Sequence, residues 1–177
     1  VTLDTPYEWN PAFNGKYRVV ALDYGIQYNI LRLLESVGCN VVVMPSRSTA
    51  DQILAHEPDG IFLSNGPGDP AALEYLHPTL RDLAERKIPM FGICLGNQVL
   101  AAALGAKTYK LKFGHRGGNQ PVLNDATKCV EISSQNHGFA VDAASVDTDK
   151  IHITHINLND NSVEAFEHKT LPLSPVQ

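Results

Sequence analysis

The chain has 177 residues, of which 44 % are hydrophobic and 19 % are charged, and its formal net charge is −5. That length suits a single domain, and the composition is that of an ordinary globular protein. A negative chain lacks the clustered Lys and Arg of a nucleic-acid surface, and no apolar run approaches the ~20 residues of a membrane span. We therefore expect neither a nucleic-acid nor a membrane partner.

Cysteine and histidine are the residues that would signal disulfides or a metal site. Cys39, Cys94 and Cys129 are odd in number and widely spaced, which gives neither a disulfide framework nor a metal-binding pattern. His152 and His155 make a poor pair of ligands, because a strand places residues three apart on opposite faces. We expect no metal, and the cysteine pattern, together with an N-terminus that lacks the features of a signal peptide, predicts a reducing, cytoplasmic setting.

The chain divides into an irregular start and a regular region. Residues 1–15 hold Pro6, Trp9 and Pro11 with little periodicity, so we predict a linker or an arm from a preceding domain. Residues 16–177 are predicted to form the domain itself. Its first half alternates short apolar runs with helical patterns, which predicts strands at 17–22, 41–44, 60–64 and 88–93 and helices at 30–37, 48–56, 76–84 and 99–104.

Strands that alternate with helices indicate parallel βαβ units, and near-continuous apolar strands indicate a sheet that is covered on both faces. We therefore predict an α/β fold with a doubly wound, mostly parallel sheet of the flavodoxin-like kind. Ser48, followed by Asp51, resembles the N-cap of the second helix. After Gly105 the pattern loosens into short strand candidates and turn clusters such as 115–119, which predicts a small antiparallel extension.

Cys94 stands between a predicted strand and a predicted helix, in the segment 92–96, which reads Gly-Ile-Cys-Leu-Gly. Small residues two positions on either side of a nucleophile are typical of a nucleophile elbow, a tight turn that exposes the side chain. Binding sites in such sheets lie at the carboxyl ends of the strands, and a helix N-terminus favours the reactive thiolate. Cys94 is therefore the candidate nucleophile, whereas Cys39 and Cys129 are interpreted as structural.

Other candidate residues are ambiguous when each is taken alone. Residues 65–70, Asn-Gly-Pro-Gly-Asp-Pro, read as an ordinary turn cluster, although glycines would also let the backbone approach a ligand. His115 and His137 are each more readily interpreted as a surface or core histidine than as a catalytic group.

In combination, these segments resemble a known family. The run 92–98, Gly-Ile-Cys-Leu-Gly-Asn-Gln, is similar to the nucleophile motif of class I (triad-type) glutamine amidotransferases. Three further segments narrow the resemblance to the glutaminase domain of carbamoyl phosphate synthetase small chains. They are 64–70 (Ser-Asn-Gly-Pro-Gly-Asp-Pro), 112–119 (Lys-Phe-Gly-His-Arg-Gly-Gly-Asn) and 134–139 (Ser-Gln-Asn-His-Gly-Phe). The likeness runs from Tyr17 to the last residue.

The resemblance implies a glutaminase. Cys94 would attack the side-chain amide of L-glutamine and release ammonia, leaving a glutamyl thioester that water hydrolyses. Leu95 and the loop that contains Gly66 and Gly68 match the family's oxyanion hole, which is built from backbone amides. The positions that hold glutamine in the family are matched by Gln98, Asn136, Gly138 and Phe139.

The resemblance also implies a partner. Ammonia would pass to a carbamoyl phosphate synthetase large subunit or domain, which would use ATP and bicarbonate and would feed arginine and pyrimidine synthesis. No cofactor is expected in the glutaminase domain itself.

The sequence departs from the family pattern at a few positions. The family completes its catalytic triad with a His-x-Glu pair near the C-terminus, but no histidine here has Glu or Asp two positions later, and His168 is followed there by Thr170. We expect that the chain is truncated, a fragment of a longer small chain in which the pair follows Gln177. Asn97 replaces a histidine that is usual in the family, and Gln27 stands where Lys is common.

Two alternatives stay open. One is a catalytically incomplete domain that binds glutamine or acts as a scaffold, because it lacks the His-x-Glu pair. The other is the glutaminase of another amidotransferase, such as that of anthranilate or GMP synthesis. The segment 114–118, Gly-His-Arg-Gly-Gly, argues against the second alternative.

Overall fold

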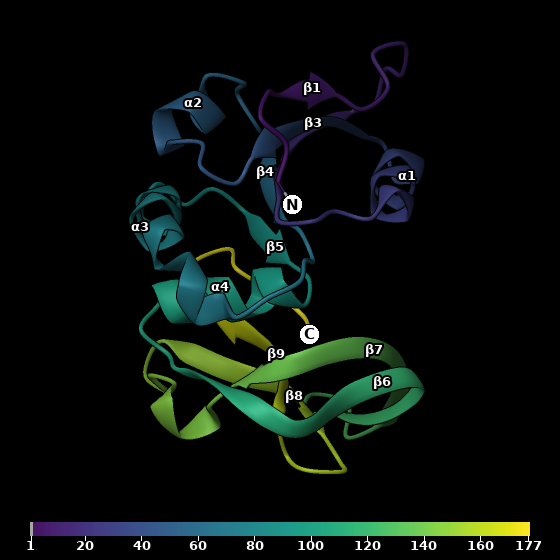
Figure 1. The fold of residues 1–177 in the computed structure, drawn as a ribbon, viewed down its shortest axis with the longest axis vertical. Helices are drawn as coiled ribbons and strands as arrows, with labels where there is room; N and C mark the ends of the chain where they lie inside the picture. The colour runs from purple at the N-terminus through teal and green to yellow at the C-terminus, as the bar shows by residue number, and fades with distance from the viewer. Residues whose placement is uncertain (1) are drawn as a thin grey trace.

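A five-stranded sheet forms the first half of the fold in the computed structural model, which describes residues 2–177 (Figure 1). The strands are β1 (Tyr7–Glu8), β2 (Tyr17–Asp23), β3 (Cys39–Pro45), β4 (Gly60–Leu63) and β5 (Met90–Gly92). They lie in the order β1-β3-β2-β4-β5. β2 pairs in parallel with β3 and β4, β4 pairs in parallel with β5, and β1 joins the edge antiparallel. The predicted doubly wound, mostly parallel sheet is confirmed.

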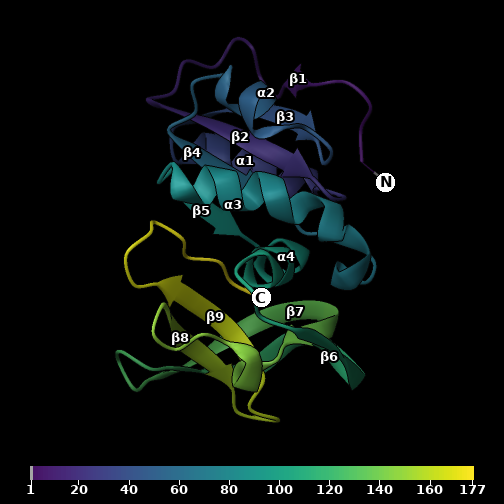
Figure 2. The same cartoon turned by 90° about the vertical axis from the view of Figure 1, so that its left-hand side faces the viewer.

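Helices cover both faces of this sheet, with α1 on one face and α2 and α3 on the other (Figures 1 and 2). The helices are α1 (Tyr28–Ser36), α2 (Ala50–Leu54), the 3-10 helix η1 (Pro70–Leu76), α3 (His77–Glu85) and α4 (Leu95–Ala103). Within β2, Val20 and Leu22 pack in the cluster that includes α3 and α4, whereas Ala21 packs with Leu31 of α1. A strand that is buried on both faces requires a continuous apolar run, which is the pattern the sequence has.

Thr49, and not Ser48, caps α2. The Thr49 hydroxyl accepts a hydrogen bond from the Gln52 backbone N–H (3.3 Å), and the Gln52 side chain accepts one from the Thr49 N–H (2.9 Å). Ser48 instead donates to the Pro45 carbonyl (2.8 Å). The predicted cap was wrong by one residue, because the reciprocal pair needs Glu or Gln at the third helical position.

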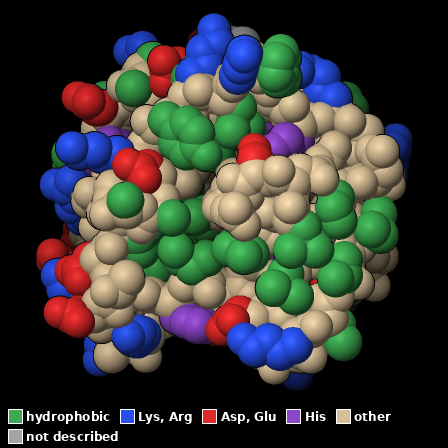
Figure 3. Space-filling view, turned by 90° about the horizontal axis from the view of Figure 1, so that it is seen from below, with side chains coloured by type: hydrophobic (Ala, Val, Ile, Leu, Met, Phe, Trp, Pro, Cys, Tyr) green, Lys and Arg blue, Asp and Glu red, His purple; other side chains and the backbone are tan. Residues whose placement is uncertain are grey.

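The second half is a closed antiparallel barrel with the strand order β6-β7-β9-β8. Its elements are β6 (Thr108–Asn124), β7 (Val130–Val141), the 3-10 helix η2 (Ala143–Ser145), β8 (Ile151–Asn157) and β9 (Val163–His168). The predicted antiparallel extension is therefore present, and it closes on itself. Figure 3 views the molecule from the barrel side, where apolar side chains reach the surface; Phe113 and Ile132 of the barrel are 79 % and 65 % exposed.

The segment 115–119 was expected to be a turn cluster, and this expectation was wrong. It lies inside β6, where His115 pairs with His137 and Arg116 pairs with Asn136 of β7. The register shifts between Gly117 and Gln120, and Gly117 has a φ of +109°. The glycines therefore make an irregularity within a long strand, which the neighbouring strand β7 keeps extended.

One hydrophobic core joins the sheet to the barrel. Phe166 of β9 and Ile151 of β8 belong to the same buried cluster as Leu63 of β4 and Leu100 of α4. Helix α4 lies between the two halves (Figure 2). The C-terminal segment returns to bridge Ile93 and Ala165 through Val176, so it lies between the end of β5 and strand β9.

The N-terminal arm lies along the edge of the sheet. β1 pairs with β3, the Trp9 indole N–H donates to Glu35 of α1 (2.8 Å), and the Leu3 N–H donates to the Asp23 carboxylate (2.9 Å). These contacts attach residues 2–15 to the sheet. None of the helices formed by residues 2–177 combines the length and apolar character that crossing a membrane requires.

We predict that Phe166→Ala destabilises both halves together by about 3–5 kcal/mol, because it opens a cavity in the shared core. Denaturant unfolding, followed by the fluorescence of Trp9 at the far edge of the sheet, measures this loss. Phe113→Ala, on the exposed surface of the barrel, is the matched control and should change the free energy of unfolding by less than about 0.5 kcal/mol. An unchanged midpoint for Phe166→Ala would show that the halves unfold independently.

Candidate active site

Cys94 occupies the junction between β5 and α4 with an unusual backbone conformation, φ 55° and ψ −106°. L-residues avoid this region, and such strain costs on the order of 1–3 kcal/mol. Backbone hydrogen bonds hold it in place: the Cys94 N–H donates to the Val176 carbonyl (2.9 Å), and the Ile93 N–H donates to the Leu63 carbonyl (3.0 Å). The strained strand-to-helix turn has the geometry of the nucleophile elbow that the sequence predicts.

The glycines on either side of Cys94 are required by close packing. A Cβ on Gly92 would lie 2.7 Å from the carbonyl carbon of Gly96. A Cβ on Gly96 would overlap the carbonyl oxygen of Leu63. The spacing Gly-x-Cys-x-Gly therefore lets helix α4 start directly against strand β4.

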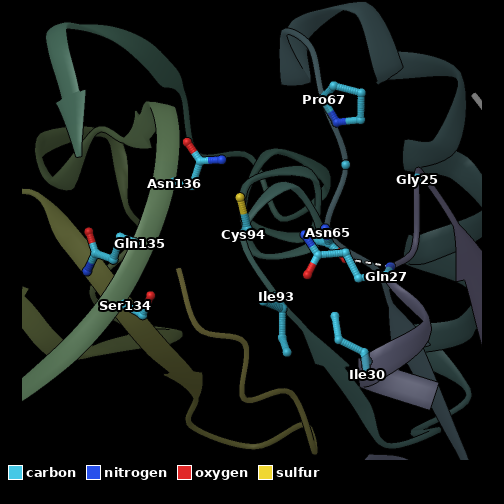
Figure 4. Close-up of a pocket in the computed structure, with 11 residues that line it drawn as sticks. Gly25, Gln27, Ile30, Asn65, Pro67, Ile93, Cys94, Ser134, Gln135 and Asn136 are labelled. Carbon is cyan, nitrogen blue, oxygen red and sulfur yellow. Dashed lines mark hydrogen bonds between the residues drawn. The ribbon is translucent and has the colours of Figure 1, made fainter. Parts of the chain in front are cut away.

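The Cys94 thiol faces a cavity of about 480 Å³ that lies between the sheet and the barrel (Figure 4). The sulfur points toward Asn136 of β7, and Asn65 and Pro67 of the loop after β4 lie across from them. A second lobe of about 400 Å³ shares Gly66, Pro67, Cys94 and Asn136 with the first. The two lobes together form one hollow around the thiol.

The structure brings the residues proposed from sequence to this hollow. Leu95 follows Cys94 as the first residue of α4, so its backbone amide lies beside the sulfur. The others line one lobe or both together with Cys94: Gly66, Gly68, Gln98, Asn136, Gly138 and Phe139.

The loop after β4 approaches the hollow with its backbone. A Cβ on Gly66 would overlap the Tyr24 carbonyl oxygen, and Gly68 has a φ of +109°, so neither position readily accepts another residue. The Ser64 hydroxyl anchors the loop, because it accepts from the Tyr24 N–H (2.9 Å) and donates to the Asn65 carbonyl (2.8 Å). Backbone amides in such a loop can stabilise a developing oxyanion.

Gln98 and Gln177 form a polar contact beneath the thiol. The buried Gln98 side-chain amide donates to the Phe139 carbonyl (2.7 Å) and to the Gln177 side-chain oxygen (2.8 Å). The Gln177 amide nitrogen is buried and makes no hydrogen bond to another protein oxygen or nitrogen. The Gln177 side chain lies close enough to Cys94 to favour its thiolate. The sequence pattern did not single out Gln177, because its approach to Cys94 depends on the return of the C-terminal segment.

Asn97 was noted as a departure from the family pattern. Its side chain is fully buried in α4, and neither side-chain polar atom has a hydrogen-bond partner. Asn97 does not line either lobe of the hollow. Gln27, the other departure, lines the first lobe, and its N–H donates to Asn65 (3.4 Å).

Burial raises the pKa of the Cys94 thiol, and the Leu95 N–H and the Gln177 side chain oppose this effect only in part. The neutral thiol therefore dominates near pH 7, so nucleophilic attack needs a base. His137 lines the second lobe, but its Nδ1 lies 2.7 Å from the Phe139 carbonyl and its Nε2 lies 2.9 Å from Gln135. Its ring nitrogens are thus already engaged by other groups.

One cluster within residues 2–177 has the residue types of a metal site. His115, His137 and Glu164 are all buried, with candidate ligand atoms within 4.8 Å of one another. These atoms are already hydrogen-bonded among themselves and to Gln135 and Asn157. We interpret the cluster as a self-contained hydrogen-bond network.

Comparison with known proteins identifies the family of the chain. The model of the family "Glutamine amidotransferase class-I" matches residues 20–177. The chain therefore belongs to the class-I glutamine amidotransferase family, and the resemblance of its motifs is confirmed. A glutamine amidotransferase from Thermotoga maritima shares the fold, with a TM-score of 0.70 and 17 % identity over 91 % of this chain and 74 % of that one.

Within the family, the chain is similar to carbamoyl phosphate synthase small chains. It is 51 % identical to that of Syntrophotalea carbinolica over 100 % of this chain and 50 % of the relative. It is 54 % identical to that of Akkermansia muciniphila over 98 % of this chain and 48 % of the relative. The chain thus spans about half the length of the curated relatives it matches.

We predict that alkylation of Cys94 by iodoacetamide is slow near neutral pH and accelerates as the pH rises, because the raised pKa keeps the thiol protonated. Peptide mass spectrometry between about pH 6 and pH 10 measures the alkylation rate of Cys94 separately from those of Cys39 and Cys129. The half-maximal rate should fall at a higher pH than for a short peptide of the same sequence. A rate that is already maximal at neutral pH would contradict the raised pKa.

Proposed function

We propose that the chain is the glutaminase domain of a carbamoyl phosphate synthetase small chain. The Cys94 thiolate attacks the side-chain carbonyl of L-glutamine, the carbon–nitrogen bond breaks, and ammonia leaves with a proton. Water then hydrolyses the glutamyl thioester to glutamate and frees the thiol. The observation that carries this proposal is the strained Cys94, which faces a cavity flanked by backbone amides.

Stabilisation of the oxyanion falls to backbone amides in this mechanism. The Leu95 N–H lies at the start of α4, where the helix dipole also favours negative charge. Amides of the loop that contains Gly66 and Gly68 would supply the second donor. Each preorganised donor of this kind contributes about 3 kcal/mol to transition-state stabilisation in comparable enzymes.

The glutamine substrate would lie between the loop after β4 and strand β7. Gln98, Asn136, Gly138 and Phe139 are the residues that we assign to hold it, because they line the second lobe beside the thiol. Asn136 offers both a donor and an acceptor, which suits the amino acid's charged and amide groups.

We propose that residues following Gln177 in the full-length protein supply the general base and the glutamate that orients it. The C-terminal segment supports this assignment, because the Val176 carbonyl accepts from the Cys94 N–H (2.9 Å). In the full-length protein, the residues that follow Gln177 would therefore begin beside the Cys94 thiol. A His-x-Glu pair at that place would be within reach of the nucleophile.

We further propose that the whole protein delivers the ammonia to a synthetase partner. Ammonia would pass to a large synthetase subunit or domain, which would use ATP and bicarbonate and would serve arginine and pyrimidine synthesis. The names and coverage of the relatives support this proposal. The glutaminase step requires only a thiol, a base and water, so we assign it no cofactor, and the three free thiols suit a cytoplasmic setting.

We predict that Cys94→Ser in the full-length protein lowers ammonia release from glutamine at least about a thousandfold, because the nucleophile is lost. A coupled glutamate dehydrogenase assay measures the ammonia. Cys129→Ser, at an exposed position on the barrel, is the control and should keep the activity of the unsubstituted protein. Ammonia release by Cys94→Ser at the unsubstituted rate would place the nucleophile elsewhere.

A second comparison separates catalysis from simple binding. If the domain only binds glutamine, the unsubstituted full-length protein releases no ammonia, and Cys94→Ser changes nothing. Glutamine binding measured by calorimetry should survive in Cys94→Ser under our proposal, because the residues that hold the substrate are intact.

A further inference from the structure

Polar side chains fill part of the barrel behind the substrate-facing strand. Five that are at least nine-tenths buried contact one another, and they come from β6, β7, β8 and β9: His115, Gln135, His137, Asn157 and Glu164. Glu164 is 3 % exposed and lines neither lobe of the hollow around Cys94. A buried carboxylate is costly unless hydrogen bonds satisfy it, so its position calls for a reason.

The side chain of Glu164 is held by two amide donors. One carboxylate oxygen accepts from Asn157 (2.8 Å), and the other accepts from Gln135 (2.6 Å). Burial raises the pKa of Glu164, and these two donors oppose the rise. Gln135 immediately precedes Asn136 in β7. The Glu164 carboxylate therefore holds the strand that faces the proposed substrate site.

The backbone of Glu164 also binds the C-terminal segment. The Glu164 carbonyl accepts from the Gln177 N–H (2.6 Å). The Gln177 side-chain oxygen accepts from Gln98, which also donates to the Phe139 carbonyl. Glu164 therefore connects β9, the C-terminal segment and helix α4.

A closed circuit of polar contacts results, because His137 continues the connection along β7. Burial lowers the pKa of His137, so its neutral ring donates only one hydrogen bond and the other ring nitrogen makes a close contact. Its Nδ1 contacts the Phe139 carbonyl (2.7 Å) and its Nε2 contacts the Gln135 side-chain oxygen (2.9 Å). The circuit runs through Glu164, Gln135, His137, Phe139, Gln98 and Gln177 and back to Glu164. Four segments that surround Cys94 are thus fixed relative to one another.

His115 lies between two carboxylates in this cluster. His115 Nε2 contacts Asp160 (2.9 Å), and His115 Nδ1 lies 3.7 Å from Glu164. His115 Nδ1 also lies 3.2 Å from His137 Nε2. Among residues 2–177, Lys and Arg form no ion pair with Glu164, so the amide donors and His115 are what hold its carboxylate in place.

We propose that Glu164 is a positioning residue for the glutamine site: its carboxylate, which accepts from Gln135, closes the circuit of polar contacts that holds the segment from Asn136 to Phe139 in place beside Cys94. This inference rests on the proposed glutaminase function for its catalytic consequence. Glu164 contacts neither the thiol nor the hollow, so its carboxylate acts through Gln135, whereas its backbone carbonyl holds Gln177. Loss of its carboxylate should weaken glutamine binding more than it slows the chemical step.

The test compares three variants of the full-length protein in glutamine-dependent ammonia release. Glu164→Ala should raise KM for glutamine about tenfold and change kcat less than about threefold, since substrate contacts are misplaced while the thiol is kept. Glu164→Gln keeps the shape and one acceptor oxygen, but its amide nitrogen would face the second donor, so it should recover only part of the loss in KM. Glu167→Ala, an exposed position on the same strand, is the matched control.

Hydrogen exchange gives a readout that does not depend on catalysis. The backbone amides of Gly138 and Phe139 should exchange faster in Glu164→Ala than in Glu167→Ala, with Glu164→Gln between them. If the unsubstituted protein releases no ammonia, the proposed function fails, and this exchange alone decides the positioning role. Equal KM values and equal exchange in Glu164→Ala and Glu167→Ala overturn the proposal, even if Glu164→Ala is less stable to heat.

Discussion

The strained backbone of Cys94 is the constraint on which the rest of the site depends. An L-residue with φ 55° and ψ −106° persists only where its surroundings hold it there. Here a strand end, the first turn of a buried helix and the carbonyl of Val176 do so together. Glycine at positions 92 and 96 follows from the same constraint, because side chains there would collide with neighbouring backbone. The conformation aims the sulfur into the hollow between the two halves.

The second half of the fold supplies the opposite wall of that hollow. Strand β7 brings Asn136 to face the thiol, and the barrel is anchored to the sheet by a shared core that includes Phe166. Burial also raises the pKa of the Cys94 thiol. The thiol therefore depends on a base before it can attack a substrate.

Local features of the site could be predicted from the sequence, whereas long-range ones could not. The strained turn at Cys94 and the alternation of strands and helices depend on residues a few positions apart. Their spacing in the sequence is therefore sufficient to predict them. The segment 115–119 looked like a turn because its glycines are local signals, yet pairing with β7 makes it a strand. Gln177 and Glu164 were missed because their partners come from distant segments, and no spacing in the sequence marks such a circuit.

Labelling with a glutamine analogue that carries a chloroketone in place of the side-chain amide tests the central claim most directly. The analogue must bind as glutamine does and then meet an activated nucleophile. Peptide mapping of the full-length protein should find the label on Cys94 alone, and added L-glutamine should slow the reaction. Label on Cys39 or Cys129, or a reaction that glutamine does not slow, would contradict the assignment of Cys94 as the nucleophile of a glutamine site.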